Sequence, residues 1–388
     1  MSNKKNILVF IDWFVPGTNA GGPVRSVYSM VKILQKDFNF KIFTRNTDHN
    51  STTPYKDVQA DTWIKFDENI EVYYCSQSNL SKEKIKNTIE SVKADKIYIN
   101  SFYSPWFSIY PLQIIKKLGL QKKVVLAPRG MLGKGALSIK PLKKKLFILF
   151  AKMKGLHKGI TWQASSENEK KDIFNVFGAS ANIQVAGNLS YIEQIKFEDK
   201  HKNTNEARLF FLSRIVPIKN LHTAIEALTG IGGDKTIVLD IYGPMEDTAY
   251  WVKCENIIKT FNKQINVSYK GVIKAEDIQR TLKNYHALLM PTLNENFGHS
   301  ILESFAAGCM VIISDQTPWN NLQQMGLGYN VNVYDPGVKD ALIQAINELC
   351  VMDATTFNTN ALKAWSFAHF YGANNAHVQA NKALFQAD

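Results

Sequence analysis

The sequence predicts an α/β protein with two doubly wound, parallel-sheet domains, and three observations support this fold class. At 388 residues, with 45% apolar and 21% charged residues, the chain exceeds what one hydrophobic core usually organises. Short β-branched and aromatic runs alternate with longer segments of helical periodicity, which is typical of parallel sheets with helical crossovers. This alternation occurs twice, on either side of a polar stretch between Gly187 and Arg208.

The first domain is predicted over residues 1–190. Its strands are expected at Ile7–Trp13, Lys41–Thr44, Val72–Cys75, Lys96–Asn100, Val124–Ala127, Ile160–Gln163 and Ile183–Val185. Its helices are expected at Val24–Lys36, Lys82–Val92, Ile109–Leu118, in the basic segment Lys140–Lys158, and from the capping box Ser166–Glu169 to Phe177.

A linker is predicted over residues 191–206, where Glu198–Glu206 is polar and charged, and a second domain over 207–365. The strands of this domain are expected at Leu209–Leu212, Thr236–Tyr242, Val267–Tyr269, Ala287–Met290 and Met310–Ile313. Its helices are expected at Leu221–Leu228, Thr248–Phe261, Glu276–Lys283 and from about Gly298. Residues 366–388 belong to a helical stretch, Ala354–Gln386, and are expected to pack back on the first domain.

The sequence contains no feature that predicts export, a membrane span or a disulfide framework. The apolar run Asn6–Asp12 is too short for a signal peptide and is better interpreted as a first strand. No eighteen apolar residues follow one another. The four cysteines are widely spaced, so we expect reduced, mostly buried thiols in a cytoplasmic protein.

The net charge of +12 is concentrated in the first half of the chain. Residues 1–190 hold 29 Lys and Arg against 14 Asp and Glu, whereas residues 191–388 hold 17 against 20. No acid occurs between Asp95 and Glu167, an interval with 14 basic residues. This stretch has three interpretations: a solvated helix face, docking on anionic lipid through Lys140–Lys158, or nucleic-acid binding, for which no recognition motif is present.

Gly21-Gly22-Pro23 follows the first strand and precedes a helix. A glycine pair there could let a phosphate or a sugar approach the backbone closely. The alternative is a tight turn with Pro23 at the first helical position.

Two cations, Arg214 and Lys219, follow the first strand of the second domain. Ligands of open parallel sheets bind beyond the carboxyl ends of the strands, so both side chains are expected at the same crevice. There they could neutralise a diphosphate by charge-assisted hydrogen bonds.

The most specific motif is the segment Pro291–Gly308. A strand ends near Met290, a loop presents Glu295, and Gly298 lets the chain turn into a helix that carries Glu303. The free amides at the start of that helix could hold phosphate. The alternative makes both acids solvated surface residues.

These residues resemble the retaining glycosyltransferases of family 4, which have the GT-B fold of two facing Rossmann-like domains. A Glu, seven residues and a second Glu form a hallmark of that family, matched by Glu295 and Glu303. The resemblance covers nearly the whole chain, because further motifs occur in family order: Gly21–Pro23, Ala127–Leu132, Ser165–Glu169, Ser213-Arg214, Lys219 and Tyr242-Gly243.

The resemblance implies a donor held between the two domains. Arg214 and Lys219 would bind its diphosphate, Glu303 its ribose, and Glu295 would lie beside the sugar. Backbone groups around Gly298, His299 and Ser300 would assist, and the nucleobase would lie near Gly271–Ile273. The full set expected at the donor is Gly21, Gly22, Gly243, Val272, Ile273, Asn296, Phe297, Gly298, His299, Ser300, Ile301 and Glu303, with Glu295, Arg214, Lys219 and Arg129 as the catalytic candidates.

Two positions depart from the family pattern. Asn296 stands where many relatives have Gly, a change we expect to be tolerated. Arg129 stands where many relatives have His facing the donor sugar, and a permanently charged guanidinium could clamp a phosphate or carboxylate but could hardly act as a base. A structural salt bridge is the alternative for Arg129.

The sequence therefore predicts a retaining glycosyltransferase with a nucleotide-diphosphate sugar as co-substrate, a UDP-sugar being favoured over a GDP-sugar, and neither a metal nor another cofactor. The expected acceptor is a lipid-linked glycan in cell-surface polysaccharide biosynthesis, with peripheral attachment to the anionic inner face of the cytoplasmic membrane and no nucleic-acid partner. The alternatives are a GT-B enzyme acting on a soluble sugar and a non-catalytic polysaccharide-assembly protein.

Overall fold

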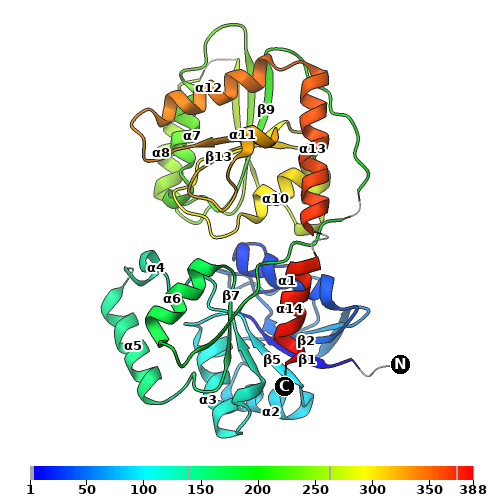
Figure 1. The fold of residues 1–388 in the computed structure, drawn as a ribbon, viewed down its shortest axis with the longest axis vertical. Helices are drawn as coiled ribbons and strands as arrows, with labels where there is room; N and C mark the ends of the chain where they lie inside the picture. The colour runs from blue at the N-terminus through cyan, green and yellow to red at the C-terminus, as the bar shows by residue number, and fades with distance from the viewer. Residues whose placement is uncertain (1–3, 139, 194, 262–263, 373–374, 388) are drawn as a thin grey trace. The chain divides into compact units, whose positions relative to one another are not determined.

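The computed structural model describes residues 4–138, 140–193, 195–261, 264–372 and 375–387, and the chain forms two compact units (Figure 1). Unit 1 comprises Met1–Tyr191 and Asn374–Asp388, and unit 2 comprises Ile192–Ala373. Each unit is built on one twisted sheet flanked by helices, so the expected division into two α/β domains is confirmed.

The sheet of unit 1 has eight strands in the order β3-β4-β2-β1-β5-β6-β7-β8. All neighbours pair in parallel except β3, which pairs with β4 in antiparallel fashion. The strands are β1 (Asn6–Phe10), β2 (Asn39–Arg45), β3 (Trp63–Asp67), β4 (Ile70–Cys75), β5 (Lys96–Ile99), β6 (Val124–Leu126), β7 (Thr161–Ala164) and β8 (Asn182–Val185).

Helices cover both faces of this sheet. They are α1 (Gly22–Leu34), α2 (Lys82–Val92), a π-helix (Pro105–Ile109) that continues into α3 (Tyr110–Lys117), α4 (Lys134–Ser138), α5 (Pro141–Met153), α6 (Glu167–Phe177) and α14 (Asn375–Gln386), with a 3₁₀ turn at Gln121–Lys123. Alternate residues of β1 pack on opposite sides. Ile7 and Val9 contact residues of α1 and α14, and Leu8 and Phe10 join a core that includes α2, α3 and α6. The doubly wound arrangement is confirmed for unit 1.

The sheet of unit 2 has six parallel strands in the order β11-β10-β9-β12-β13-β14. They are β9 (Glu206–Leu212), β10 (Thr236–Tyr242), β11 (Ile265–Gly271), β12 (Ala287–Met290), β13 (Met310–Ser314) and β14 (Gly328–Val331). The central strand β12 is wholly buried, as expected for a parallel strand covered on both faces.

The helices of unit 2 are α7 (Leu221–Leu228), α8 (Thr248–Ile258), α9 (Ile278–Leu282), α10 (His299–Ala306), α11 (Leu322–Met325), α12 (Val338–Val351) and α13 (Ala354–Gly372), with 3₁₀ turns at Pro217–Lys219 and Ala275–Asp277. Ile225, Leu302 and Phe357, from α7, α10 and α13, lie in the same core as the strands. This core fixes the strand ends from which the site loops emerge.

The chain differs from the predicted domain boundaries in two places. Residues of the expected linker 191–206 pack on unit 2: the Lys200 amide donates to Asn358 Oδ1 at 2.8 Å, and the buried Lys202 donates to the Cys350 carbonyl at 3.0 Å. The second difference is that α13 continues within unit 2 past residue 365, and only α14 belongs to unit 1. Residues 194, 373–374 and 388 of these predicted segments lie outside the described residues.

The end of the chain is part of the unit 1 core through α14. The Phe385 ring lies 5.5 Å from that of Phe38 and 5.8 Å from that of Tyr98, centroid to centroid. Among the residues that the structure describes, no helix combines the length and apolar character needed to cross a bilayer.

Candidate functional site

The loops that follow β9 and β12 are held against each other. These strands are neighbours, with Leu209 opposite Ala287. Beyond their carboxyl ends, the Leu293 amide donates to the Ile218 carbonyl at 2.8 Å, and the Thr292 hydroxyl donates to the same oxygen at 3.1 Å. One edge of the sheet therefore brings together two chain segments that are far apart in the sequence, as expected for ligand-binding loops.

Lys219 and Glu295 form an ion pair between these two loops. The Lys219 Nζ lies 2.6 Å from Glu295 Oε2, and the side chains are 10% and 20% exposed, respectively. Lys219 ends the 3₁₀ turn before α7, and the Glu295 amide donates to the Gln316 carbonyl at 3.0 Å. An ammonium group has three donors, so Lys219 can hold Glu295 and still donate to a bound anion.

Gly298 sets the start of α10. Its φ of 80° is left-handed, and a Cβ there would lie 2.6 Å from Ile301 Cδ1 and 3.3 Å from Glu295 Cγ. A side chain would disturb both the helix start and the acid. His299 and Ser300 open α10, the buried Ile301 anchors it, and the half-buried Glu303 lies one turn further on.

The two residues before Gly298 also stabilise the loop. The Asn296 amide donates to Glu295 Oε1 at 3.1 Å, so both carboxylate oxygens of Glu295 have donors. The carbonyl of Phe297 accepts a hydrogen bond from Trp319 Nε1, and its ring lies 4.7 Å from that of His299. Asn296 itself is exposed.

The loops after β9 and β10 are also joined. Gly243 has a φ of 138°, and a Cβ there would lie 1.8 Å from the Ser213 carbonyl oxygen, so only glycine fits. Beside it, Arg214 Nη1 lies 2.7 Å from Glu246 Oε2. Arg214 and Lys219 thus leave the same strand end but pair with different carboxylates.

Val272 and Ile273 follow β11 at the same edge of the sheet. The Gly243 amide donates to the Gly271 carbonyl at 2.8 Å, which fixes the end of β11 against the loop after β10. Val272 is 43% exposed, whereas Ile273 packs partly on the core. The structure therefore gathers the predicted residues of unit 2 on adjoining loops at the carboxyl ends of β9 to β12.

Gly21 and Gly22 belong to unit 1, where they start α1. Gly21 caps the helix with a φ of 65°, and Pro23 stands in its first turn. A Cβ at Gly22 would meet no atom within 4 Å. The turn geometry requires glycine at position 21 only.

Arg129 also belongs to unit 1, and its partners are neutral. It donates from Nε to Asn100 Oδ1 at 2.7 Å, from Nη2 to the Tyr98 hydroxyl at 2.6 Å, and from Nη1 to Asn188 Oδ1. Burial raises the pKa of Tyr98, which therefore stays protonated and donates to Gln163 Oε1 at 2.6 Å. Among the described residues no carboxylate pairs with Arg129, so the salt-bridge alternative is wrong, and a network of hydrogen bonds holds the guanidinium instead.

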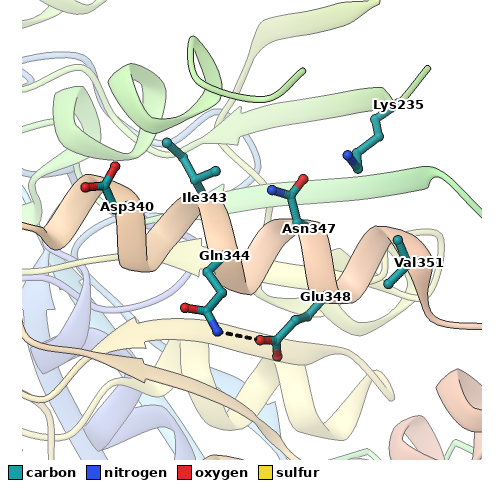
Figure 2. Close-up of a pocket in the computed structure, with 7 residues that line it drawn as sticks. All are labelled: Lys235, Asp340, Ile343, Gln344, Asn347, Glu348 and Val351. Atoms are coloured by element: carbon teal, nitrogen blue, oxygen red, sulfur yellow. Dashed lines mark hydrogen bonds between the residues drawn. The ribbon is translucent and has the colours of Figure 1, made fainter. Parts of the chain in front are cut away.

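A shallow pocket of unit 2 lies elsewhere, on α12 (Figure 2). It is lined by Lys235, Asp340, Ile343, Gln344, Asn347, Glu348 and Val351. Lys235 directly precedes β10, so this pocket borders the amino end of that strand, opposite the site loops. None of the predicted site residues lines it.

Residues 192–360 match the family model of glycosyl transferases group 1. The group 1 match spans β9 to β14 and both ion pairs of the site loops. No curated protein sequence matches the chain.

Solved glycosyltransferase structures resemble the whole chain. Anabaena HepE in complex with UDP-glucose has 15% identity and a TM-score of 0.64, and each chain is covered over 98% of its length. Sucrose-phosphate synthase from Thermosynechococcus elongatus has 14% identity and a TM-score of 0.67, covering 99% of this chain and 98% of that one. An E. coli trehalose-6-phosphate structure bound with UDP-2-fluoro glucose has 12% identity and a TM-score of 0.66, with 99% of both chains covered. The expected GT-B fold is confirmed.

Sequence reasoning missed three residues that shape this candidate site. Glu246 pairs with Arg214, Gln316 accepts from the Glu295 amide, and Trp319 donates to Phe297. For Glu246 and Gln316, the signal in the sequence was that each residue follows a predicted strand. These strands are β10 and β13 in the structure. Within the described ranges, no group of three or more His, Cys, Asp or Glu is placed to hold a metal ion.

Proposed function

We propose that the protein is a retaining, family 4-like glycosyltransferase that moves a sugar from a nucleotide-diphosphate donor to a lipid-linked glycan, in the biosynthesis of a cell-surface polysaccharide. The observation that carries the proposal is the ion pair between Lys219 and Glu295, positioned beside the Gly298 turn into α10. A cation, a carboxylate and a helix start on adjoining loops suit a ligand with a diphosphate at one end and a sugar at the other.

In this proposal the donor diphosphate accepts hydrogen bonds from Lys219, from Arg214 and from the first amides of α10. These donors are fixed before the reaction, so they stabilise the negative charge that grows on the leaving diphosphate. Glu295 lies beside the sugar, and Glu303, one helical turn on, faces the ribose. A UDP-sugar is the favoured donor because two of the similar solved structures hold UDP-glucose or its 2-fluoro analogue.

The acceptor and the location follow from charge. The interval between Asp95 and Glu167, free of acids and rich in lysine, suits a diphosphate lipid and anionic headgroups. A peripheral position at the inner face of the cytoplasmic membrane would bring the enzyme to such an acceptor. Nucleic acid is not among the proposed partners.

Thermal shifts with UDP, GDP and their sugar conjugates test the donor assignment, because a ligand that binds only the native state raises the melting temperature. We expect UDP to stabilise the wild type and to lose most of this effect in Lys219→Met. Lys339→Met is the matched control, since Lys339 forms an equally short pair with Glu226, 2.6 Å, away from the site. Equal shifts in both variants would contradict the proposal.

A soluble sugar acceptor is the second candidate, favoured by the similarity to sucrose-phosphate synthase. Transfer assays with radiolabelled UDP-sugars separate the two: label in the organic phase of lipid extracts supports the lipid-linked acceptor, and label on free sugars or sugar phosphates supports the soluble one. A non-catalytic assembly protein would keep its role after Glu295→Gln and transfer no label.

A further inference from the structure

Helix α5 (Pro141–Met153) carries two opposite apolar faces, and unit 1 buries only one of them. Ala151 is fully buried, and Phe147 and Ile148 pack partly on the core. The Phe147 ring lies 5.7 Å from Phe102 and 5.6 Å from Tyr103. These contacts fix the helix to the unit by one side.

The other face is exposed and apolar. Its members and their exposed fractions are Leu142 (75%), Leu146 (67%), Leu149 (56%), Phe150 (50%) and Met153 (77%). Their spacing is that of one helical face, within an arc of about 100°. The centre of this arc is opposite Ala151. Scattered exposed apolar residues are normal, but five on one face form a patch that requires a partner.

Lysines border this stripe on both sides. Lys143 and Lys154 lie along one border, and Lys145 and Lys152 along the other, at about 100° per residue around the helix. All four are exposed, and among the described residues no carboxylate forms an ion pair with them. The remaining lysine of α5, Lys144, faces the unit and donates to the Ala136 carbonyl at 2.5 Å.

We propose that the stripe formed by Leu142, Leu146, Leu149, Phe150 and Met153 inserts into the interface of an anionic bilayer, with α5 lying parallel to the membrane plane. An apolar face bordered by lysines is the pattern of helices that lie in a lipid interface. Lysine stems reach past the apolar stripe to the headgroup phosphates. This inference rests on the proposed function, because insertion of α5 would bring the enzyme to a lipid-linked acceptor. It adds that apolar side chains enter the bilayer interface, beyond the attraction between charges.

The lysines that border the stripe argue against a second copy of the chain as its partner. Two α5 stripes facing each other would bring their lysine borders together, and none of these four lysines forms an ion pair with a carboxylate of the described residues. Anionic headgroups offer the opposite charge. Figure 1 shows α5 at the periphery of unit 1, beside α6.

Vesicle sedimentation of the full chain tests the insertion of α5. We expect the wild type to bind phosphatidylcholine vesicles that contain about a quarter phosphatidylglycerol, and to bind pure phosphatidylcholine at least about tenfold more weakly. Leu146→Ser with Leu149→Ser keeps the charge and should weaken binding to the anionic vesicles about tenfold or more. The matched control is Val252→Ser with Phe370→Ser, which removes two exposed apolar side chains of unit 2 and should bind as the wild type does.

Insertion depth gives an independent readout. All four native cysteines are buried, so Leu149→Cys can be labelled selectively with an environment-sensitive fluorophore such as NBD. The emission should shift to the blue on anionic vesicles, and the same label at Val252→Cys should not respond. Binding without a blue shift would overturn insertion, and sedimentation of the Ser variant equal to that of the wild type would overturn the role of the stripe.

Two further measurements separate this inference from its alternatives. A mass measurement in solution that shows a dimer dependent on Leu146 and Leu149, with no vesicle binding, would assign the stripe to a second copy and overturn the proposal. UDP-induced thermal shifts should be equal in the wild type and the Ser variant. A wild-type protein that binds UDP but not anionic vesicles would contradict only the insertion of α5, whereas absent UDP binding in both proteins would contradict the proposed function.

Discussion

Lys219 and Glu295 lie 2.6 Å apart although 76 residues separate them in the chain. The pair exists because β9 and β12 are adjacent and their carboxyl-end loops are hydrogen-bonded through Ile218. Both charges are largely shielded from water, so each partner depends on the other more than an exposed pair would. The geometry of the acid is therefore coupled to the cation that we propose for the diphosphate.

Replacing Lys219 by Met should lower turnover about 10²–10³-fold, because it removes one preorganised cation from the developing diphosphate charge. It also leaves Glu295 without its counter-charge. Steady-state kinetics with the donor sugar measure the effect, and Lys339→Met should retain wild-type rates. Turnover lost equally in both variants would indicate general destabilisation.

Replacing Glu246 by Gln should raise the affinity for UDP about two- to fivefold, because breaking a partly exposed pair costs little and releases Arg214 for phosphate. Isothermal titration at low and high salt measures it, and added salt should shrink the difference. Weaker binding would show instead that Glu246 positions Arg214.

Replacing Gly298 by Ala should destabilise the protein by about 1–3 kcal/mol, because the left-handed φ and the contact with Ile301 both oppose a side chain. It should also weaken UDP binding by shifting the start of α10. Gly232→Ala is the matched control, as a Cβ there meets no atom within 4 Å and should cost almost nothing. Denaturant melts compare the two.

Replacing Arg129 by Lys should destabilise the protein by about 2–4 kcal/mol. A lysine ammonium cannot reproduce the hydrogen bonds that the planar guanidinium donates to Asn100, Asn188 and Tyr98. Urea melts measure the cost. Unchanged stability with impaired sugar transfer would assign Arg129 to the reaction rather than to the structure.

His157 makes stability depend on pH. It is buried against Phe102 and Trp162, and this burial lowers its pKa from 6.5 to about 3. The unfolded chain therefore binds a proton below about pH 6.5 that the native state takes up only near pH 3, so stability falls as the pH falls through this window. At pH 5 the loss is about 2 kcal/mol.

His157→Phe removes this group while keeping an aromatic ring, so its stability should exceed that of the wild type by about 2 kcal/mol more at pH 5 than at pH 7.5. Urea melts at the two pH values measure it. The buried His286, whose pKa is lowered to about 4, is present in both proteins and cancels in the comparison. Parallel pH profiles would contradict the assignment.

Local sequence patterns predicted the strands that carry the site. Thr236–Tyr242 and Ala287–Met290 were expected with the bounds that β10 and β12 have, because β10 is rich in β-branched and apolar residues and β12 is a continuous apolar run. β14 (Gly328–Val331) was missed, since four residues that begin with glycine carry little strand signal. β3 (Trp63–Asp67) was missed because its residues are half-buried or exposed.

Side-chain partners could not be predicted, because they depend on how loops from different strands meet. Lys219 and Glu295 were both expected at the donor, but not as a pair. Glu246, the ion-pair partner of Arg214, had no sequence signal beyond its position after β10. The neutral partners of Arg129 come from three separate segments, so no local pattern could distinguish them from a salt bridge.

Hydrogen–deuterium exchange of the full chain with and without saturating UDP tests the central claim most directly. The account predicts slower exchange in the loops that follow β9, β10 and β12 and at the start of α10, around Arg214, Lys219 and Glu295–Ser300. Protection confined to the α12 pocket, or to segments that contain none of these residues, would contradict it.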